Sequence, residues 1–141
     1  MKVFCLQECN NKVVQQFVTK LTQLTRLSVN NNDDITDQNF SALIDDNSST
    51  LVHLELKYVF ANSKRILLRF PLTKLKELTL IRCGSNIVNQ VEPQVSELQK
   101  LCIIDENYYT STEKLNTLIK GNAPTLHYLE LSADNKLEGN F

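Results

Sequence analysis

The chain has no tryptophan, only three glycines and only two histidines among its 141 residues. It contains no Gly-x-Gly-x-x-Gly motif, no phosphate-binding loop and no nucleophile elbow. No Cys-x-x-Cys pair occurs either, and two histidines alone do not predict a zinc site. His53 and His127 stand outside any recognisable catalytic motif. We therefore expect no catalytic residues, no cofactor, no metal and no enzymatic activity.

The charges are nearly balanced, with 15 Lys and Arg against 16 Asp and Glu and a net charge of −1. A nucleic-acid groove or an anionic membrane surface would require an excess of basic residues, so we expect neither as a partner. No apolar run approaches the roughly 20 residues of a membrane span. The first apolar run, residues 3–6, is too short for a secretory signal. We therefore expect an intracellular protein, cytoplasmic or nuclear.

What the chain does have is a recurring six-residue pattern, apolar-x-x-apolar-x-apolar. The pattern begins at six positions that are 23 to 28 residues apart: Met1, Leu24, Leu51, Leu75, Leu98 and Leu126. Self-similarity at such a period is typical of solenoid proteins, in which each repeat is one structural unit that stacks on its neighbours. Apolar residues make up 42% of the chain, which is enough for such a stack to form a core.

Each repeat predicts a strand, and most predict a helix after it. Within the pattern apolar and polar residues alternate, as in Leu54-Glu55-Leu56-Lys57, which is typical of a strand with one buried face. Apolar stripes at helical spacing follow four of the patterns, within residues 14–21, 40–44, 66–70 and 115–119. The fourth connection, residues 87–93, predicts a helix of only about one turn.

Strands that alternate with helices over short loops predict a parallel sheet with the helices on one side. At this short period the sequence resembles the leucine-rich repeat family over nearly its whole length. The extended motif is best kept in residues 24–32, LTRLSVNNN, and in residues 75–83, LKELTLIRC. The family places Asn or Cys at the ninth position of the motif. This chain has Cys9, Asn32 and Cys83 there, whereas the other three repeats have Val59, Glu106 and Asp134.

The resemblance implies an α/β solenoid, a horseshoe of about six repeats in a single domain over residues 1–141. The parallel sheet would line its concave face and short helices its convex face. Such domains recognise other proteins. Residues 35–43, ITDQNFSAL, are similar to the cysteine-containing subclass, which often forms the recognition part of F-box proteins. By resemblance, the chain is the substrate-recognition part of an F-box-type ubiquitin-ligase adaptor. The alternatives are a structural scaffold subunit of a larger assembly and a horseshoe that inhibits an enzyme, as ribonuclease-inhibitor-like proteins do.

Strand alternation also predicts which residues face away from the helices, namely those at the third, fifth and seventh positions of each pattern. These positions form three columns across the sheet, and the resemblance makes this concave face the surface that binds another protein. The candidate binding residues are Arg26, His53, Glu55, Lys57, Glu77, Ile81, Lys100, Cys102, Ile104, Tyr128 and Glu130. The acidic and basic residues among them balance, so no basic stripe is expected.

Ile81, Cys102 and Ile104 are predicted to lie side by side on adjacent strands and to face solvent. An exposed apolar cluster among charged residues is typical of a contact site. Alternatively, these residues only reflect the preference of strands for β-branched side chains. Tyr128, near Glu130, is a second candidate anchor because tyrosine is favoured at interfaces, and its alternative is an ordinary strand aromatic.

The four cysteines are expected to be free thiols. Cys9 and Cys83 hold the same position three repeats apart, which is about 15 Å at the usual spacing of strands. A disulfide needs Cα atoms within about 7 Å of each other. Cys5 and Cys102 are separated by four strands and are farther apart still. Free thiols are consistent with a reducing compartment.

The outer strands of such a sheet each have one edge without a neighbour, which favours association. Repeat arrays also need polar caps, and no cap is evident before the first pattern or after the last. We therefore expect that the domain is a segment of a longer solenoid, or that other chains make end-to-end contacts with it.

Overall fold

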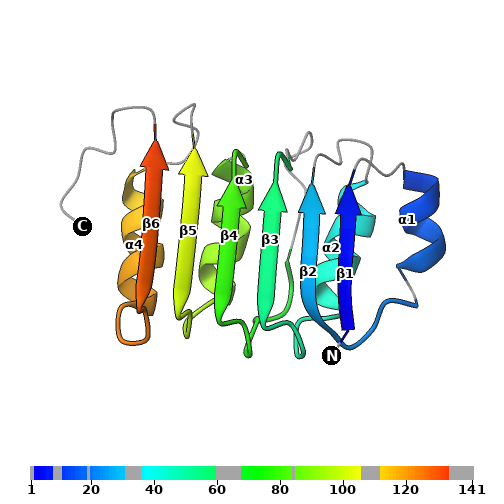
Figure 1. Ribbon diagram of the computed structural model, residues 1–141, viewed down its shortest axis with the longest axis horizontal. Helices are drawn as coiled ribbons and strands as arrows, with labels where there is room; N and C mark the ends of the chain where they lie inside the picture. Colours follow the sequence, from blue (N-terminus) through cyan, green and yellow to red (C-terminus); the bar gives the residue numbers. More distant parts are fainter. Residues whose placement is uncertain are drawn as a thin grey trace.

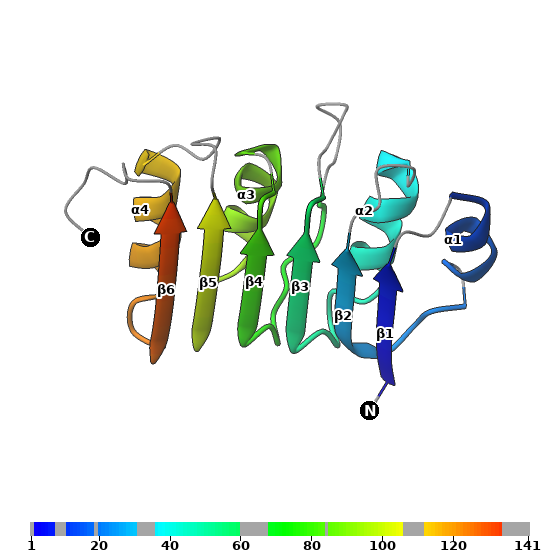
Figure 2. The ribbon, with the colours of Figure 1, turned by 45° about the horizontal axis from the view of Figure 1, so that its top comes forward.

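A computed structural model describes residues 2–7, 11–18, 20–30, 36–59, 68–83, 85–105 and 112–133. These residues form one sheet whose strands follow each other in chain order, with helices packed behind it (Figure 1). The tilted view in Figure 2 shows the same succession, from β1 at one edge of the sheet to β6 at the other.

Six strands make up the sheet in the described part of the chain. They are β1 (Lys2–Gln7), β2 (Leu24–Asn30), β3 (His53–Lys57), β4 (Glu77–Ile81), β5 (Lys100–Asp105) and β6 (Tyr128–Ala133). Every strand pairs in parallel with the next one along the chain. The prediction of an α/β fold with a parallel sheet and short helices is confirmed.

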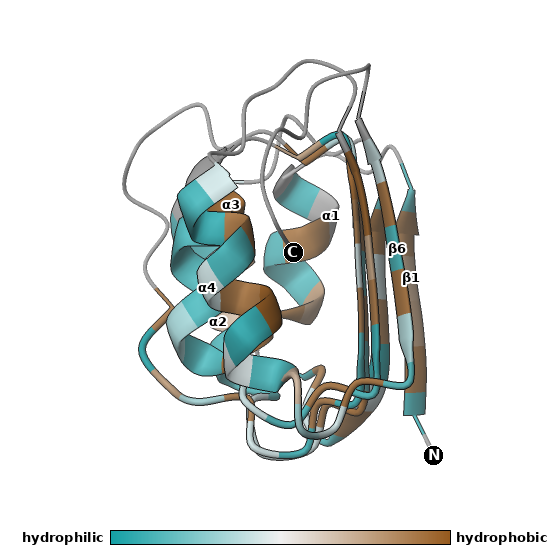
Figure 3. Cartoon of the chain, turned by 90° about the vertical axis from the view of Figure 1, so that its left-hand side faces the viewer, coloured by the Kyte–Doolittle hydropathy of each residue, from teal (hydrophilic) through white to brown (hydrophobic). Residues whose placement is uncertain are grey.

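The helices lie on one face of the sheet. They are α1 (Asn11–Phe17), α2 (Asp37–Asp45), α3 (Ser85–Val91) and α4 (Thr112–Asn122), and a short 3-10 helix, η1 (Glu92–Gln94), follows α3. Figure 3 views the sheet edge-on and shows these helices on one side only. The opposite face of the sheet carries no helix from the described residues. None of the described helices has the length and apolar character needed to cross a membrane.

The core fills the space between the sheet and the helices. Leu27, Leu54, Leu78 and Leu101 are aligned across β2 to β5, and each is at most 1% exposed. Burial of one such leucine contributes about 1.5–3 kcal/mol to folding. In the same column Leu129 of β6 is 42% exposed, so the core is open to solvent at that end of the sheet.

The third connection differs from its prediction. Residues 66 and 67 of the expected apolar stripe lie outside the described residues, and Phe70 is not helical and is 53% exposed. Leu68, 4% exposed, enters the core instead. Its backbone is bound by two glutamines from the next repeat: the Leu68 N–H donates to Gln90 Oε1 at 3.3 Å, and Gln94 Nε2 donates to the Leu68 carbonyl at 3.0 Å. These tertiary hydrogen bonds hold the backbone of Leu68 in a non-helical conformation.

The fourth connection differs in the opposite sense, because it is more helical than predicted. Instead of a single turn, α3 spans seven residues and continues directly into η1. Ile87, Val88 and Val91 of α3 are each 1% exposed, so this helix is anchored by its apolar face. Pro93 lies in the first turn of η1, where its missing N–H costs no helical hydrogen bond.

A buried asparagine links the second repeat to the first. Asn47 follows α2 and is 0% exposed. Its Oδ1 accepts from the N–H of Leu24, the first residue of β2, at 2.9 Å. Its Nδ2 donates to the carbonyls of Leu21 and Leu43, both at 2.8 Å. Thr50 completes the link by donating to the Leu24 carbonyl at 2.7 Å. The side chain of Asn47 is therefore fully engaged in the interior.

Asn122, the last residue of α4, makes the equivalent link in the fifth repeat and is also 0% exposed. Its Oδ1 accepts from the Leu98 N–H at 3.0 Å, and its Nδ2 donates to the Leu118 carbonyl at 2.8 Å. Thr125 donates to the Leu98 carbonyl at 2.7 Å. The pattern Asn-x-x-Thr-Leu at residues 47–51 and 122–126 therefore ties the end of a helix to the start of the preceding strand.

Replacement of Asn122 by alanine is expected to lower the free energy of unfolding by about 2–4 kcal/mol. The substitution removes two buried hydrogen bonds and leaves the Leu98 N–H without its acceptor. Urea unfolding followed by circular dichroism measures the change. Asn89→Ala, at an exposed position of α3, is the matched control and should change stability by less than about 0.5 kcal/mol. Equal losses in the two variants would contradict this role of Asn122.

Candidate functional site

The uncovered side of the sheet is formed by the third, fifth and seventh residues of each repeat pattern, and we call it the open face. Its three columns across β1 to β6 are those predicted from strand alternation. The first column is Val3, Arg26, His53, Glu77, Lys100 and Tyr128; the second is Cys5, Ser28, Glu55, Thr79, Cys102 and Glu130; the third is Gln7, Asn30, Lys57, Ile81, Ile104 and Ser132. All eleven candidate binding residues therefore lie on one surface.

These residues differ in how far they extend into solvent. Arg26, Lys100, Tyr128 and Glu130 are exposed. The other seven, His53, Glu55, Lys57, Glu77, Ile81, Cys102 and Ile104, are half-buried against their neighbours on the sheet. The most exposed charged side chains, Arg26, Lys100 and Glu130, thus lie toward the two ends of the open face. The charged side chains of the central strands β3 and β4 are half-buried.

Glu77 is held between two neighbours in the first column. Its carboxylate contacts Nδ1 of His53 on β3, and its other oxygen lies 3.4 Å from Nζ of Lys100 on β5. The hydrogen bond with His53 is the main cause that lowers the pKa of Glu77, and Lys100 lowers it further. The Nδ1 atom of His53 is therefore engaged by a carboxylate, which fixes the orientation of the imidazole ring on the open face.

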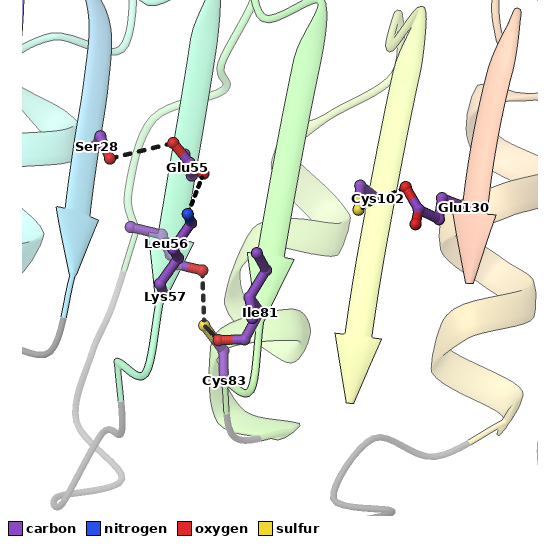
Figure 4. Close-up of polar contacts among 8 residues, drawn as sticks. All are labelled: Ser28, Glu55, Leu56, Lys57, Ile81, Cys83, Cys102 and Glu130. Carbon is purple, nitrogen blue, oxygen red and sulfur yellow. Dashed lines mark hydrogen bonds and ion pairs between the residues drawn. The ribbon is translucent and has the colours of Figure 1, made fainter. Parts of the chain in front are cut away.

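Glu55 is paired in the same way in the second column. Its Oε1 lies 3.1 Å from Nζ of Lys57, two residues along β3, and its Oε2 accepts from the Ser28 hydroxyl of β2 at 3.2 Å (Figure 4). Two of the three basic side chains of the open face, Lys57 and Lys100, are thus neutralised within the face itself.

Cys102 and Glu130 form a polar contact that strand alternation alone did not predict. The Cys102 thiol lies 3.5 Å from Glu130 Oε2 and donates to it, as Figure 4 shows, and the Tyr128 hydroxyl donates to the same oxygen at 3.0 Å. Burial, together with the negative charge of Glu130, raises the pKa of Cys102 to about 11. The hydrogen bond to Glu130 also raises the pKa of Tyr128. Cys102 is therefore a polar member of the group that the sequence predicted as an apolar cluster.

Ile81 and Ile104 are directly paired across β4 and β5, as predicted, and both are half-buried. They are the aliphatic part of the open face, near the carboxyl ends of the strands. Their carbonyls accept hydrogen bonds from the residues that follow the preceding strands. The N–H of Tyr58, which follows β3, donates to the Ile81 carbonyl at 2.8 Å, and the N–H of Arg82, which follows β4, donates to the Ile104 carbonyl at 2.7 Å. The backbones of Tyr58 and Arg82 therefore lie next to those of the aliphatic pair.

Sequence reasoning missed Tyr58 and Arg82. Both have left-handed backbone conformations, with φ of 54° and 51°, which non-glycine residues seldom adopt. The guanidinium of Arg82 stacks over the ring of Tyr58 at 5.4 Å from its centroid, a cation–π contact. The available signal was that an aromatic and an arginine occupy the eighth position in consecutive repeats, since tyrosine and arginine are enriched among residues that dominate binding energy.

The ninth position supports the loops instead of contributing to the open face. Cys83 is 4% exposed, and its thiol donates to the Leu56 carbonyl at 3.3 Å (Figure 4). Val59 is likewise 4% exposed and takes the same position in the preceding repeat. The remaining ninth positions, Cys9, Asn32, Glu106 and Asp134, lie outside the described residues.

The thiols of Cys5, Cys83 and Cys102 are free, as predicted, whereas Cys9 is outside the described part of the chain. In that described part, no three His, Cys, Asp or Glu side chains come together in a way that could hold a metal ion. Comparison with protein-family models found no matching family, and comparisons with curated proteins and with solved structures found no match either.

The raised pKa of Cys102 predicts slow alkylation near neutral pH. With a pKa of about 11, only about one thiol in a thousand is ionised at pH 8, and the thiolate is the reactive form. The rate at Cys102 should therefore keep rising as the pH increases toward 11. Iodoacetamide labelling followed by peptide mass spectrometry measures this rate, with the exposed Cys5 as an internal reference.

Glu130→Gln removes the negative charge beside the Cys102 thiol and should lower its pKa, although burial still raises it. Labelling of Cys102 at pH 8 should become faster in this variant, while labelling of Cys5 stays unchanged. An unchanged rate at Cys102 would show that the contact with Glu130 does not affect the thiol.

Proposed function

We propose that this protein is a non-catalytic module of the leucine-rich repeat type that recognises another protein through its open face. The observation that carries the proposal is the half-buried pair Ile81 and Ile104, aligned on adjacent strands. The backbones of Tyr58 and Arg82, whose side chains stack on each other, donate hydrogen bonds to the carbonyls of this pair. Aliphatic groups surrounded by aromatic and charged ones are the usual make-up of an interface centre and its rim.

The chemistry of the open face favours recognition over catalysis. Its half-buried cysteine has a pKa far above neutrality, whereas a reactive cysteine would need a lowered thiol pKa. Its histidine is held by Glu77 on the neighbouring strand, and the same glutamate also pairs with Lys100. The ion pairs within the face instead fix side-chain positions, which lowers the entropic cost of ordering the surface when a partner binds.

A more specific role follows from the resemblance of residues 35–43 to the cysteine-containing subclass of the family. On that basis we propose that the partner is a substrate protein and that the module serves an F-box-type ubiquitin-ligase adaptor. In the structure, Thr36 caps α2 by accepting from the Asn39 N–H at 3.2 Å, so this segment begins a helix on the covered side of the sheet. The open face remains available for the substrate.

Ile81→Asp and Ile104→Asp should each reduce partner binding by about tenfold or more, because a carboxylate would be buried without a counter-charge at the centre of the contact. The full chain is used to purify its partners from its native cells, and the binding of each captured protein is then measured by surface plasmon resonance. Asn89→Asp, on the exposed surface of α3, adds the same charge on the covered side and should leave binding unchanged. Circular dichroism confirms that the variants fold. Partners that bind both isoleucine variants at full affinity would refute recognition by the open face.

One observation favours a second role, that of a structural subunit. Leu129 of β6 is 42% exposed, whereas the leucines aligned with it on β2 to β5 are at most 1% exposed. At this end of the described sheet, β6 therefore presents both an apolar side chain and a strand edge. Such an edge suits end-to-end contact with another chain or a further repeat.

The solution mass of the chain tests this second role. End-to-end contact predicts a mass that rises with concentration, measured by sedimentation equilibrium, and that returns to the monomer value when Leu129 is replaced by Lys. A mass of 16.1 kDa at all concentrations would contradict contact between copies of this chain.

A further inference from the structure

The ion pairs of the open face leave one basic side chain without a partner. Lys57 pairs with Glu55 and Lys100 pairs with Glu77. Arg26, the remaining basic residue, is exposed on β2 and has neither an ion pair nor a side-chain hydrogen bond with any residue that the structure describes. Its positive charge is therefore directed to solvent at one end of the open face.

The matching unpaired acid lies near the other end. Glu130 on β6 is exposed and accepts hydrogen bonds from two neutral donors, the Cys102 thiol and the Tyr128 hydroxyl. No lysine or arginine of the described residues neutralises it. The hydrogen bond to this carboxylate raises the pKa of Tyr128, and after burial the same carboxylate is the next cause that raises the pKa of Cys102. The open face is therefore positive at β2, negative at β6 and internally neutralised between them.

The two unpaired charges are separated by a fixed span. Four strand steps lie between β2 and β6, about 19 Å at the usual spacing of paired strands. The backbone groups of the intervening strands are already used in the parallel sheet, so a ligand on this face must be recognised by side chains and not by strand addition. Ile104, on β5, is one strand away from Glu130, and Ile81 is two strands away.

We propose that the open face binds a linear segment of a partner protein in one direction across the strands, with an acidic side chain at Arg26, a basic side chain at Glu130, and an aliphatic side chain close to the basic end, on Ile81 and Ile104. This inference deepens the proposed function and depends on it. An extended segment covers the span between the charges in about six residues and a helical one in about thirteen, because the rise per residue is about 3.3 Å in a strand and 1.5 Å in a helix.

The direction of binding gives the test. A random peptide library displayed on phage is selected against the immobilised full chain, and the enriched peptides are then synthesised, together with versions in which the acidic and basic residues are exchanged. Affinities are measured by fluorescence polarisation for the wild type and for the charge-reversed variant Arg26→Glu/Glu130→Arg. We expect the wild type to prefer the selected peptides over their exchanged versions by roughly tenfold, and the charge-reversed variant to show the opposite preference.

The matched control is Glu113→Lys/Lys120→Glu, which reverses two exposed charges on α4, on the covered side of the sheet, and keeps the net charge. Its peptide preference should equal that of the wild type. Peptides without a common charge order, an exchanged peptide that binds the wild type equally well, or a selection that yields no binders would each overturn the inference. So would self-association of the wild type that the charge-reversed variant abolishes, because the face would then be filled by a second copy.

The test also separates this inference from the proposed function. Peptides that lose binding in Ile104→Asp but show no preferred charge order would leave recognition by the open face standing and would refute only the stated direction. Peptides that bind Ile81→Asp, Ile104→Asp and the charge-reversed variant as tightly as the wild type would refute both.

Discussion

The parallel pairing of the strands, without a shift in register from β2 to β6, is the constraint on which the rest of the structure depends. Because side chains alternate along a strand with a period of two, a slip by one residue would bring the buried leucines to the open face and the charged residues into the core. The register also decides which polar groups meet. Glu77 contacts His53 and Lys100, and Cys102 contacts Glu130, because the pairing places these residues on neighbouring strands at the same level. The hydrogen bonds that hold the sheet together therefore also determine the pattern of charge on its surface.

Much of this arrangement could be predicted from the sequence, because six copies of one apolar pattern at a nearly constant period allow only one register that places the apolar positions of all strands on the same face. The columns of the open face follow residue by residue, as the pairing of Ile81 with Ile104 shows. The connections were harder to predict. In the third one, a few apolar residues at helical spacing do not distinguish a helix from an extended segment. In its described part, Leu68 donates to Gln90 and accepts from Gln94, and these bonds hold its backbone outside a helix. Those bonds join distant parts of the chain and leave no local trace in the sequence.

The details of the candidate site could be predicted only in part from the sequence. Tyr58 and Arg82 escaped prediction because left-handed backbone conformations are expected of glycine or asparagine, and a tyrosine or an arginine does not indicate such a conformation. The direction of the Cys102 thiol toward Glu130 depends on rotamers, which strand alternation does not fix. The buried Asn47 did leave a signal, the pattern Asn-x-x-Thr-Leu that recurs at residues 122–126, but asparagines are so frequent in this chain that the spacing, and not the residue type, carries the information.

If the open face binds a partner as proposed, the balance of its charges assigns different roles to its apolar and its charged residues. A lysine paired with a neighbouring glutamate has little field beyond a few ångströms, so the central pairs neither attract nor repel a partner strongly. In the proposed recognition, affinity would then come mainly from the apolar surface of Ile81 and Ile104, which is not directional. In the proposed binding mode, Arg26 and Glu130 would supply the direction that the apolar contact lacks, because a partner segment turned end to end would place like charges together at both ends of the face. A surface with no net charge can in this way still favour one orientation of its partner.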